Sequence, residues 1–299
     1  MTIAGFSFPD PAPFQPGKPI FLAGPTAAGK SAAALELAER FNGEIISVDS
    51  MQVYRGMDIG TAKPAAEERK RVPHHLIDIA DIAEPFDAAK FVALARAAAA
   101  DILARGRTPI LCGGTGLYFK AYLEGLGDAP PGDAQLRAKL AATPLEELLA
   151  ELERTDPAII EKVRKNPRRV IRAVEVIRLT GRPFSEQRAA WTGACREAGT
   201  FLGLTRPAGE LRERIHRRVD EMFQRGLVAE TERLLATGFE QNATAMQALG
   251  YRQVVEYLRG QRPLPEAIEL VKIRTRQFAK RQLTWFRRQM RLEWLSPSA

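Results

Sequence analysis

Cysteine is scarce in this chain of 299 residues, which holds only Cys112 and Cys195 and no C-x-x-C pair. Two separate thiols exclude a disulfide-rich scaffold and disfavour a zinc site built from thiolates. Long apolar runs are absent too. No stretch reaches the roughly 18 residues of a membrane-spanning helix, and the apolar stretch 19–24 is too short for a signal-peptide core. We therefore expect a cytoplasmic protein that binds no membrane.

Acidic residues are outnumbered, with 36 Asp and Glu against 44 Lys and Arg, so the net charge is +8 at pH 7. The segment 271–291 holds eight basic residues and no acidic one, and it alone accounts for the excess. Such a segment favours a polyanionic partner, because phosphates neutralised by Lys or Arg release condensed counterions. A solvated basic helix face is the alternative interpretation.

The first 17 residues are rich in proline and lack a periodic pattern, so we expect residues 1–17 to be a disordered tail. Beyond this tail, short apolar runs typical of strands alternate with helical patterns. The strands are expected at 19–24, 44–48, 75–79 and 108–112, and the helices at 29–41 and 86–105. Strands that alternate with helices predict an α/β fold with a parallel sheet covered on both faces.

The alternation stops near residue 125. Residues 126–199 are helical in pattern, with breaks at prolines, and they predict a helical insertion domain. One further strand is expected at 200–205, and residues 211–291 have the pattern of a helical, basic C-terminal portion. The α/β core would then consist of residues 18–125 and 200–299.

A phosphate-loop pattern, G-x-x-x-x-G-K-[ST], directly follows the first expected strand and opens a helix. Its residues are Gly24, Pro25, Thr26, Ala27, Ala28, Gly29, Lys30 and Ser31. Glycines let the backbone curl so that N–H groups point at phosphate oxygens, with the positive end of the helix behind them. Lys30 adds a charge, and the Ser31 hydroxyl suits Mg²⁺. The pattern predicts a diphosphate or polyphosphate ligand.

Carboxylates at strand ends are candidates for the other side of the reaction, because ligands of open α/β sheets bind beyond the carboxyl ends of the strands. Asp49 follows the second expected strand, and it could order Mg²⁺ through water, accept a proton from an attacking group, or only cap a turn. Asp78 is a second candidate on the metal side. A second glycine-rich turn, 113–116, makes Thr115 a candidate wall of the site.

Further blocks along most of the chain carry a more specific signal. They read IISVDSMQVYRGMDIGTAKP at 45–64, PHHLID at 73–78, GGTGLYF at 113–119, NPRRVIRAVEV at 166–176, GYRQ at 250–253 and TRQFAKRQLTWFR at 275–287. With these blocks and the phosphate loop, the chain resembles the bacterial type of the tRNA dimethylallyltransferases, also called tRNA isopentenyltransferases. The family usually shows an Asp at the position of Asn166 and a Gln at that of Arg168.

The resemblance implies transfer of a dimethylallyl group from dimethylallyl diphosphate to N6 of the adenosine immediately 3′ of the anticodon in tRNA, with Mg²⁺ as cofactor. It implies a nucleoside-kinase-like P-loop core, an insertion domain that contacts tRNA, and a monomer that binds the anticodon stem-loop. Catalytic roles fall on Asp49, Thr26 and Lys30, diphosphate binding on Gly24 to Ser31, and Mg²⁺ binding on Ser31. The implied tRNA contacts are Asp49, Ser50, Met51, Gln52, Thr115, Arg137, Arg168, Arg169, Arg172, Gln247, Gly250, Tyr251, Arg252, Lys280, Arg281, Gln282, Trp285 and Arg287.

The residues agree with this chemistry. A cradle of N–H groups, Lys30 and Mg²⁺ would act where charge builds on the leaving diphosphate, and Asp49 could take the proton of the adenine amino group. Tyr251 or Trp285 could stack on bases or pack in the core. Three other functions fit part of the sequence: an ATP-dependent phosphotransferase acting on a small molecule, a prenyltransferase acting on free adenine nucleotides, and an RNA-binding P-loop module without catalysis.

Overall fold

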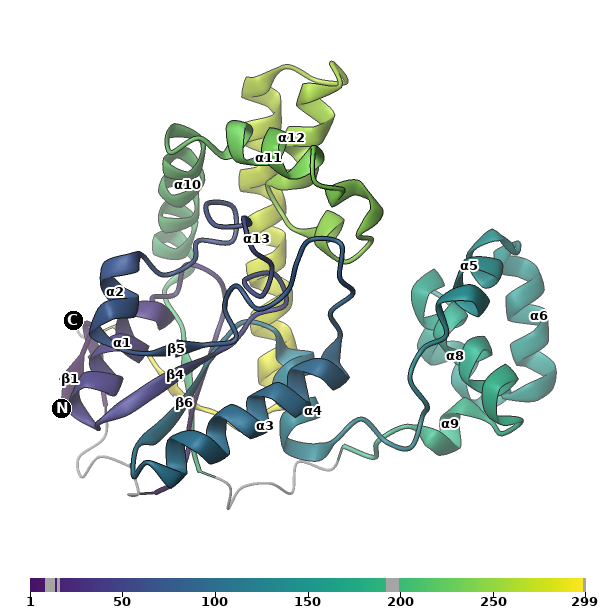
Figure 1. The fold of residues 1–299 in the computed structure, drawn as a ribbon, viewed down its shortest axis with the longest axis horizontal. Coiled ribbons are helices and arrows are strands. Elements are labelled where there is room, and N and C mark those ends of the chain that lie inside the picture. Colours follow the sequence, from purple (N-terminus) through teal and green to yellow (C-terminus); the bar gives the residue numbers. More distant parts are fainter. Residues whose placement is uncertain (9–13, 15–16, 192–198, 298–299) are drawn as a thin grey trace. The chain divides into compact units, whose positions relative to one another are not determined.

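A parallel sheet forms the centre of the larger of two compact units in this computed structural model, which describes residues 1–8, 14, 17–191 and 199–297 (Figure 1). Its strands are β3 (Ile20–Ala23), β4 (Gly43–Val48), β5 (His74–His75), β6 (Thr108–Gly113), β7 (Thr200–Leu204) and β8 (Glu293–Leu295). They stand in the order β5-β4-β6-β3-β7-β8, and every pairing between them is parallel. The predicted α/β fold class is confirmed.

Two strands differ from the expectation. β5 covers only His74–His75, so the strand predicted over 75–79 is wrong beyond its first residue. Leu76 and Asp78 have φ angles of 63° and 57°, and such left-handed conformations end an extended strand. The sequence does not predict β8, because three residues are too few to show an alternating pattern.

Helices cover both faces of the sheet. Successive residues of a strand point to opposite sides, so the two faces bury different side chains of the same strand. Ile20 and Leu22 of β3 belong to a core that they share with α1 (Lys30–Arg40). Phe21, which lies between them, belongs to a second core with α3 (Ala88–Ala104). This alternation makes β3 apolar throughout, as expected of a central strand buried on both sides.

The C-terminal part adds α10 (Ala208–Gln224), α11 (Leu227–Leu235), α12 (Tyr251–Leu258) and α13 (Leu264–Gln289). The 26-residue α13 packs against both α10 and α12 (Figure 1). A proline in its first turn costs little, because the first N–H groups of a helix have no partner within the helix. The helical pattern of residues 211–291 is thus confirmed. In the described part of this unit, the remaining α-helices are α2 (Ala66–Arg71) and α4 (Gly116–Glu124), and short 3₁₀ turns lie at Phe239–Gln241 and Ala245–Gln247.

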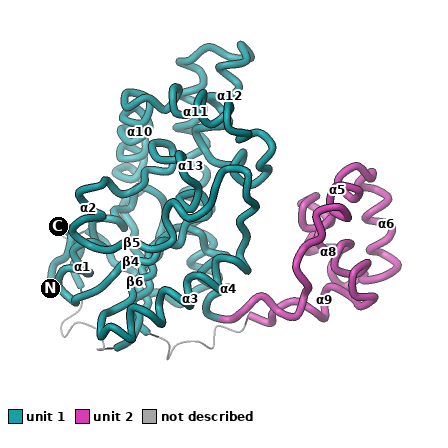
Figure 2. Tube along the Cα trace, viewed as in Figure 1, with its two compact units in different colours: residues 1–123, 195–299 teal, residues 124–194 magenta. Residues whose placement is uncertain are grey.

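Residues 124–194 form the second unit, which has its own apolar core (Figure 2). Its helices are α5 (Ala134–Ala142), α6 (Leu145–Thr155), α7 (Ile160–Val163), α8 (Pro167–Thr180) and α9 (Phe184–Gln187), with a short 3₁₀ turn at Pro157–Ile159. The unit corresponds to the insertion expected at 126–199, with borders shifted by a few residues. Asn166 caps α8 by accepting the N–H of Arg169, a role that Asp would fill equally well.

The expected tail is wrong for its first eight residues. β1 (Thr2–Ile3) and β2 (Phe6–Ser7) form an antiparallel hairpin, and Ile3, Phe6 and Phe8 are buried in the core beneath α1. A count of prolines could not reveal this, because the signal lies in three apolar residues around a tight turn. Residues 9–13 and 15–16 of the expected tail lie outside the described residues. Among the helices of the described part, none is long and apolar enough to cross a membrane.

A buried carboxylate lies near the amino-terminal ends of the strands. Glu44 is 1% exposed, and it accepts hydrogen bonds from Arg105, Arg107 and His75. The bonds from Arg105 are the main reason why the pKa of Glu44 is held at about 2, below its ordinary 4.5. The folded state therefore binds this proton less well than the unfolded state does.

We expect Glu44→Gln to flatten the dependence of stability on pH between 4.5 and 2. The stabilisation from a lowered carboxyl pKa is complete above the unfolded-state value of 4.5 and is lost as the pH falls toward 2. It amounts to on the order of 3 kcal/mol at neutral pH, of which roughly 1 kcal/mol is lost by pH 3.5. Urea unfolding at pH 7, 5 and 3.5 measures this loss, with the exposed Glu39→Gln as control. Equal slopes for the native protein and Glu44→Gln would contradict it.

Candidate active site

The phosphate loop connects β3 to α1, as the sequence predicts. Gly24 has a φ of 150°, and a Cβ atom there would lie 2.5 Å from the carbonyl oxygen of Leu204. Gly29 has a φ of 108°. Only glycine adopts such conformations without strain, so the two fixed glycines of the pattern have a steric reason here.

Two arginines hold the loop from outside. Arg214 donates from Nε to the carbonyl of Ala27 at 2.9 Å, and Arg206 donates from Nε to that of Ala28 at 2.7 Å. Because a peptide unit is planar and trans, a carbonyl held on one side directs the following N–H to the other. Arg206 itself is covered by the ring of Phe6, whose centroid lies 4.8 Å from the guanidinium carbon. The N-terminal hairpin and α10 thus fix the orientation of the loop.

Lys30 lies beneath the loop, and its ammonium donates to the carbonyl of Pro25 at 2.7 Å. Burial lowers the pKa of Lys30 to about 8, with a further decrease from Arg218, while Cys112 and Asp49 act in the opposite direction. Strand β6 pairs with both β3 and β4, so the loop that follows β3 and Asp49, which follows β4, lie at the same edge of the sheet. The structure therefore brings together the phosphate loop and the carboxylate that the sequence singled out.

Asp49 directly follows β4 and shapes the next turn. Its Oδ1 accepts the N–H groups of Met51 at 2.8 Å and of Gln52 at 3.3 Å, while Ser50 N–H bonds to the Thr115 hydroxyl at 3.2 Å. The capping role considered for Asp49 is therefore real, but it uses one oxygen. Within the described residues, Oδ2 has no hydrogen-bond partner, and it remains free to act on a ligand.

Both carboxylate oxygens of Asp78 are engaged in ion pairs. It forms ion pairs with Lys63 and with Arg69, the second at 2.7 Å. Burial acts to raise the pKa of Asp78, but hydrogen bonds from these two cations outweigh it and hold the pKa below its ordinary value. This pairing of both oxygens disfavours the metal-side role considered for Asp78, which stays a prediction.

Arg218 is a site residue that sequence reasoning missed. It is half-buried on α10, and burial lowers its pKa, whereas Asp49 acts to raise it. In the described part of the chain it forms no ion pair, so its charge is available to a ligand. The sequence does place Arg218 four residues after Arg214, and this spacing puts both side chains on one face of the helix that follows β7.

Helix α13 lies over the second glycine-rich turn. A Cβ atom on Gly114 would lie 2.3 Å from Nε2 of Gln282, and one on Gly116 would lie 2.2 Å from the ring of Trp285. Gln282 is 8% exposed. It accepts the N–H of Thr26 and donates to the carbonyl of Gly114, each at 2.9 Å. Gln282 therefore bridges the two glycine-rich loops, and the tRNA contact implied for it stays a prediction.

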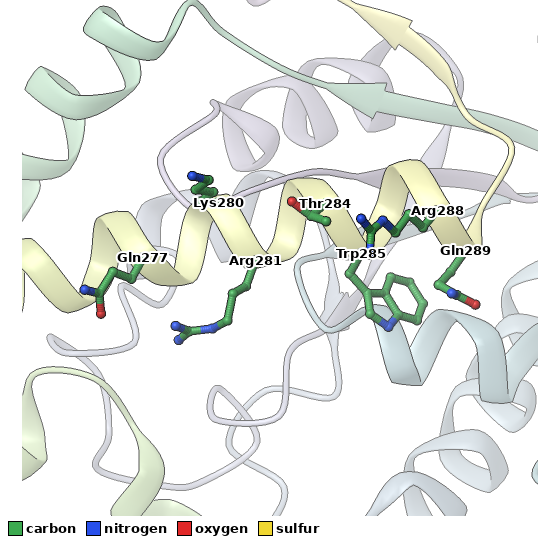
Figure 3. A pocket seen from close by; sticks show the side chains of 7 residues that line it. All are labelled: Gln277, Lys280, Arg281, Thr284, Trp285, Arg288 and Gln289. Atoms are coloured by element: carbon green, nitrogen blue, oxygen red, sulfur yellow. The ribbon is translucent and has the colours of Figure 1, made fainter. Parts of the chain in front are cut away.

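Helix α13 also lines a hollow of about 540 Å³, to which Trp285 contributes as well (Figure 3). Its lining residues recur every three or four positions and so share one face: Gln277, Lys280, Arg281, Thr284, Trp285, Arg288 and Gln289. Of the eight basic residues of 271–291, Lys272 alone pairs with carboxylates among the described residues. Arg287 is exposed and lies over the Trp294 ring. Most of the charge on this helix is thus unneutralised.

Residues in and just before the GYRQ block (250–253) differ in how exposed they are. Tyr251 is fully buried and its hydroxyl donates to Glu230 at 2.6 Å, so the suggestion that it stacks on a base is wrong. Gly250 is also buried. Gln247 and Arg252 are exposed and remain candidates for contact with a partner.

The four candidate arginines of the second unit also differ, in whether they pair with a carboxylate of the unit. Arg137 and Arg172 pair with Glu175, which is completely buried, so both have a structural partner within the unit. Arg168 and Arg169 are exposed at the start of α8 and pair with no carboxylate in the described residues.

Comparison with known proteins identifies the family of this chain. The family model described as IPP transferase matches residues 52–289. tRNA dimethylallyltransferase 1 of Trichlorobacter lovleyi is 47% identical over 285 residues, which cover 93% of each chain. The tRNA dimethylallyltransferase of Thermomicrobium roseum is 48% identical over 284 residues, covering 93% of this chain and 86% of that protein.

Solved structures show the same likeness. The tRNA isopentenylpyrophosphate transferase of Bacillus halodurans is 43% identical, with a TM-score of 0.68 over 94% of this chain and 90% of its own. A eukaryotic dimethylallyltransferase, described as acting on tRNA, is 30% identical, with a TM-score of 0.75 over 93% of this chain and 73% of its own. The chain therefore belongs to the IPP transferase family, and its compared relatives are named tRNA dimethylallyltransferases or tRNA isopentenylpyrophosphate transferases.

Proposed function

We propose that this protein transfers a dimethylallyl group from dimethylallyl diphosphate to N6 of the adenosine immediately 3′ of the anticodon in tRNA. The observation that carries the proposal is that the phosphate loop with Lys30 and the end of β4 with Asp49 lie at the same edge of the sheet, where β6 pairs with both β3 and β4. Arg218 lies one helical turn beyond Arg214, which holds the loop. Two cations suit a diphosphate leaving group, and a carboxylate with one free oxygen suits an attacking amine. Family membership supplies the identity of both substrates.

The reaction breaks the bond between the allylic carbon and a diphosphate oxygen and forms a bond from that carbon to N6. Charge builds on the leaving oxygens, so the loop N–H groups, Lys30 and Arg218 stabilise the transition state where the charge develops. The N–H of Thr26 donates to Oε1 of Gln282 and is therefore not one of these loop groups. Asp49 orients the amino group and takes the proton that N6 loses, a role typically worth about 10² to 10⁴ in rate.

Mg²⁺ is the cofactor that these residues fit. Among the described residues, no three His, Cys, Asp or Glu side chains form a preformed cage. Ser31 offers an exposed hydroxyl in the first turn of α1. A single protein oxygen combined with substrate phosphates and water is typical of Mg²⁺, which retains several of its waters. Ser31 would hold the ion, which would neutralise charge on the diphosphate.

The tRNA is held by exposed basic side chains. On α13 these are Lys280, Arg281 and Arg287, and on α8 they are Arg168 and Arg169. Side chains of this kind bind phosphates with little dependence on base sequence. The adenosine must leave its stack to reach Asp49, which costs a few kcal/mol and least for an unpaired loop base.

Incubation with labelled dimethylallyl diphosphate tests the proposal. Parallel reactions contain tRNA, AMP, or ATP with small alcohols. Label transferred only to tRNA supports it. Transfer to AMP, phosphorylation of an alcohol, or tRNA binding without transfer would establish one of the three other functions instead.

Pyrophosphate binding should weaken as the pH rises through 8. Burial lowers the pKa of Lys30 to about 8, and only its charged form attracts phosphate. At pH 9 about one tenth of the side chain is charged, so we expect about a tenfold loss of affinity between pH 7 and 9 in calorimetry. Lys30→Arg stays charged and serves as the control. An identical pH profile for this variant would contradict the role of Lys30.

Asp49→Asn should abolish proton transfer by this side chain while the turn that it caps still forms. Asparagine keeps the oxygen that caps the turn but loses the charge and the capacity to accept a proton. We expect single-turnover prenylation of tRNA to fall by roughly 10² or more, with nearly unchanged pyrophosphate binding and Mg²⁺ dependence. A raised Mg²⁺ requirement would instead assign Asp49 to the metal, and a near-normal rate would remove it from the mechanism.

Reversal of Lys280, Arg281 and Arg287 to Glu should weaken binding of all tRNAs almost uniformly. The slope of log affinity against log salt should become shallower by about 0.7 to 0.9 for each tRNA phosphate that the variant no longer neutralises. The control reverses three exposed cations on other helices, Arg40, Lys70 and Lys90, and so changes the net charge equally. The same slope in both triple variants would show that α13 is only a solvated basic face.

A further inference from the structure

A buried carboxylate outside the phosphate and acceptor groups lacks an assigned role. Glu230 on α11 is 3% exposed, and no Lys or Arg pairs with it in the described part of the chain. It accepts the N–H groups of three consecutive residues: Asp58 at 3.2 Å, Ile59 at 2.9 Å and Gly60 at 3.2 Å. Burying a carboxylate is costly, so these bonds must compensate for its lost hydration.

Tyr251 on α12 completes the arrangement. Its hydroxyl donates to Glu230 at 2.6 Å and accepts the N–H of Gly60 at 3.2 Å. Its ring occupies the space beside Gly60, where a Cβ atom would lie 2.3 Å from a ring carbon. Residues 58–60 are therefore held by two helices: α11 binds their N–H groups through the Glu230 carboxylate, and α12 contacts Gly60 through the hydroxyl and ring of Tyr251.

The held segment leads directly to the acceptor turn. The amide of Gln52 donates to the carbonyls of Thr61 at 3.2 Å and Ala62 at 3.4 Å, and its oxygen accepts the Ser47 hydroxyl at 2.8 Å. The backbone N–H of Gln52 in turn bonds to Oδ1 of Asp49. A continuous set of hydrogen bonds thus joins α11 to the carboxylate through residues 58–62 and Gln52.

We propose that Glu230 is a positioning residue that orients Asp49 through residues 58–62 and Gln52, with Tyr251 as its partner. This inference rests on the proposed role of Asp49 as acceptor-side base. The effect is confined to the acceptor side, because none of these bonds reaches the phosphate loop. The Tyr251 hydroxyl then serves geometry at the site rather than contact with tRNA bases.

Two substitutions and a matched control test the inference. Glu230→Gln keeps the shape but replaces one acceptor oxygen by a donor that faces backbone N–H groups, and Tyr251→Phe removes only the hydroxyl. Thr231→Val is the control, since Thr231 is also buried on α11 but bonds only within its helix, to Leu227. A displacement of the reacting groups of about 1 Å can cost up to about 10² in rate.

At saturating tRNA we expect single-turnover prenylation to fall about tenfold to a hundredfold in Glu230→Gln and severalfold in Tyr251→Phe. Pyrophosphate affinity should change less than about twofold, and Thr231→Val should keep its rate even if it melts earlier. Unchanged rates in both test variants would overturn the inference. So would a rate decrease in Thr231→Val that matches the test variants at equal melting temperature, because that would indicate general destabilisation.

Hydrogen exchange gives a readout that does not depend on activity. Amides of residues 49–52 and 58–62 should exchange faster in Tyr251→Phe than in the native protein, whereas amides of 24–31 should not. Unchanged exchange at 49–52 would overturn the inference even if activity fell. If the native protein failed to prenylate tRNA but the exchange pattern held, the proposed function would be wrong while the link from Glu230 to Asp49 stood.

Discussion

The orientation of the phosphate loop is the constraint on which the site depends. A glycine-rich loop can curl in many ways, and its N–H groups serve a ligand only if its carbonyls are held elsewhere. Here Arg214 and Arg206 hold the carbonyls of Ala27 and Ala28, and Gln282 bonds to the N–H of Thr26. These partners lie far along the chain from the loop, so the N-terminal motif is shaped by the C-terminal half of the protein.

Charges are divided between two environments with different physical consequences. Lys30 and Arg218 are half-buried, so their electrostatic interactions are stronger than in open water and salt screens them less. The cations of α13 that line the hollow are exposed, so salt screens their interactions strongly. The first group suits a leaving group that gains charge during a reaction, and the second suits the extended backbone of a nucleic acid.

Burial separates residues that look alike in sequence. Tyr251 and Gln282 lie in blocks rich in exposed cations, yet both are buried and bonded to the backbone of neighbouring segments. Arg137 and Arg172 neutralise the buried Glu175, whereas Arg168 at the start of the same helix as Arg172 is exposed. Charge and aromaticity predict the chemistry that a side chain can perform. Its accessibility decides whether it performs that chemistry on a partner or within the fold.

The sequence alone determined the parallel α/β core and the helical insertion, because the alternation of strands and helices is a local pattern. It also determined where the phosphate loop lies and that Asp49 follows a strand, because a fixed glycine spacing and a carboxylate after an apolar run can be read locally. Only the tertiary structure decided that Asp78 is paired, that residues 1–8 form a buried hairpin, and that Arg214 of α10 holds the phosphate loop. Those features arise from contacts between residues distant in the chain. Such contacts are governed by packing and desolvation at particular points of the fold, which no local pattern encodes.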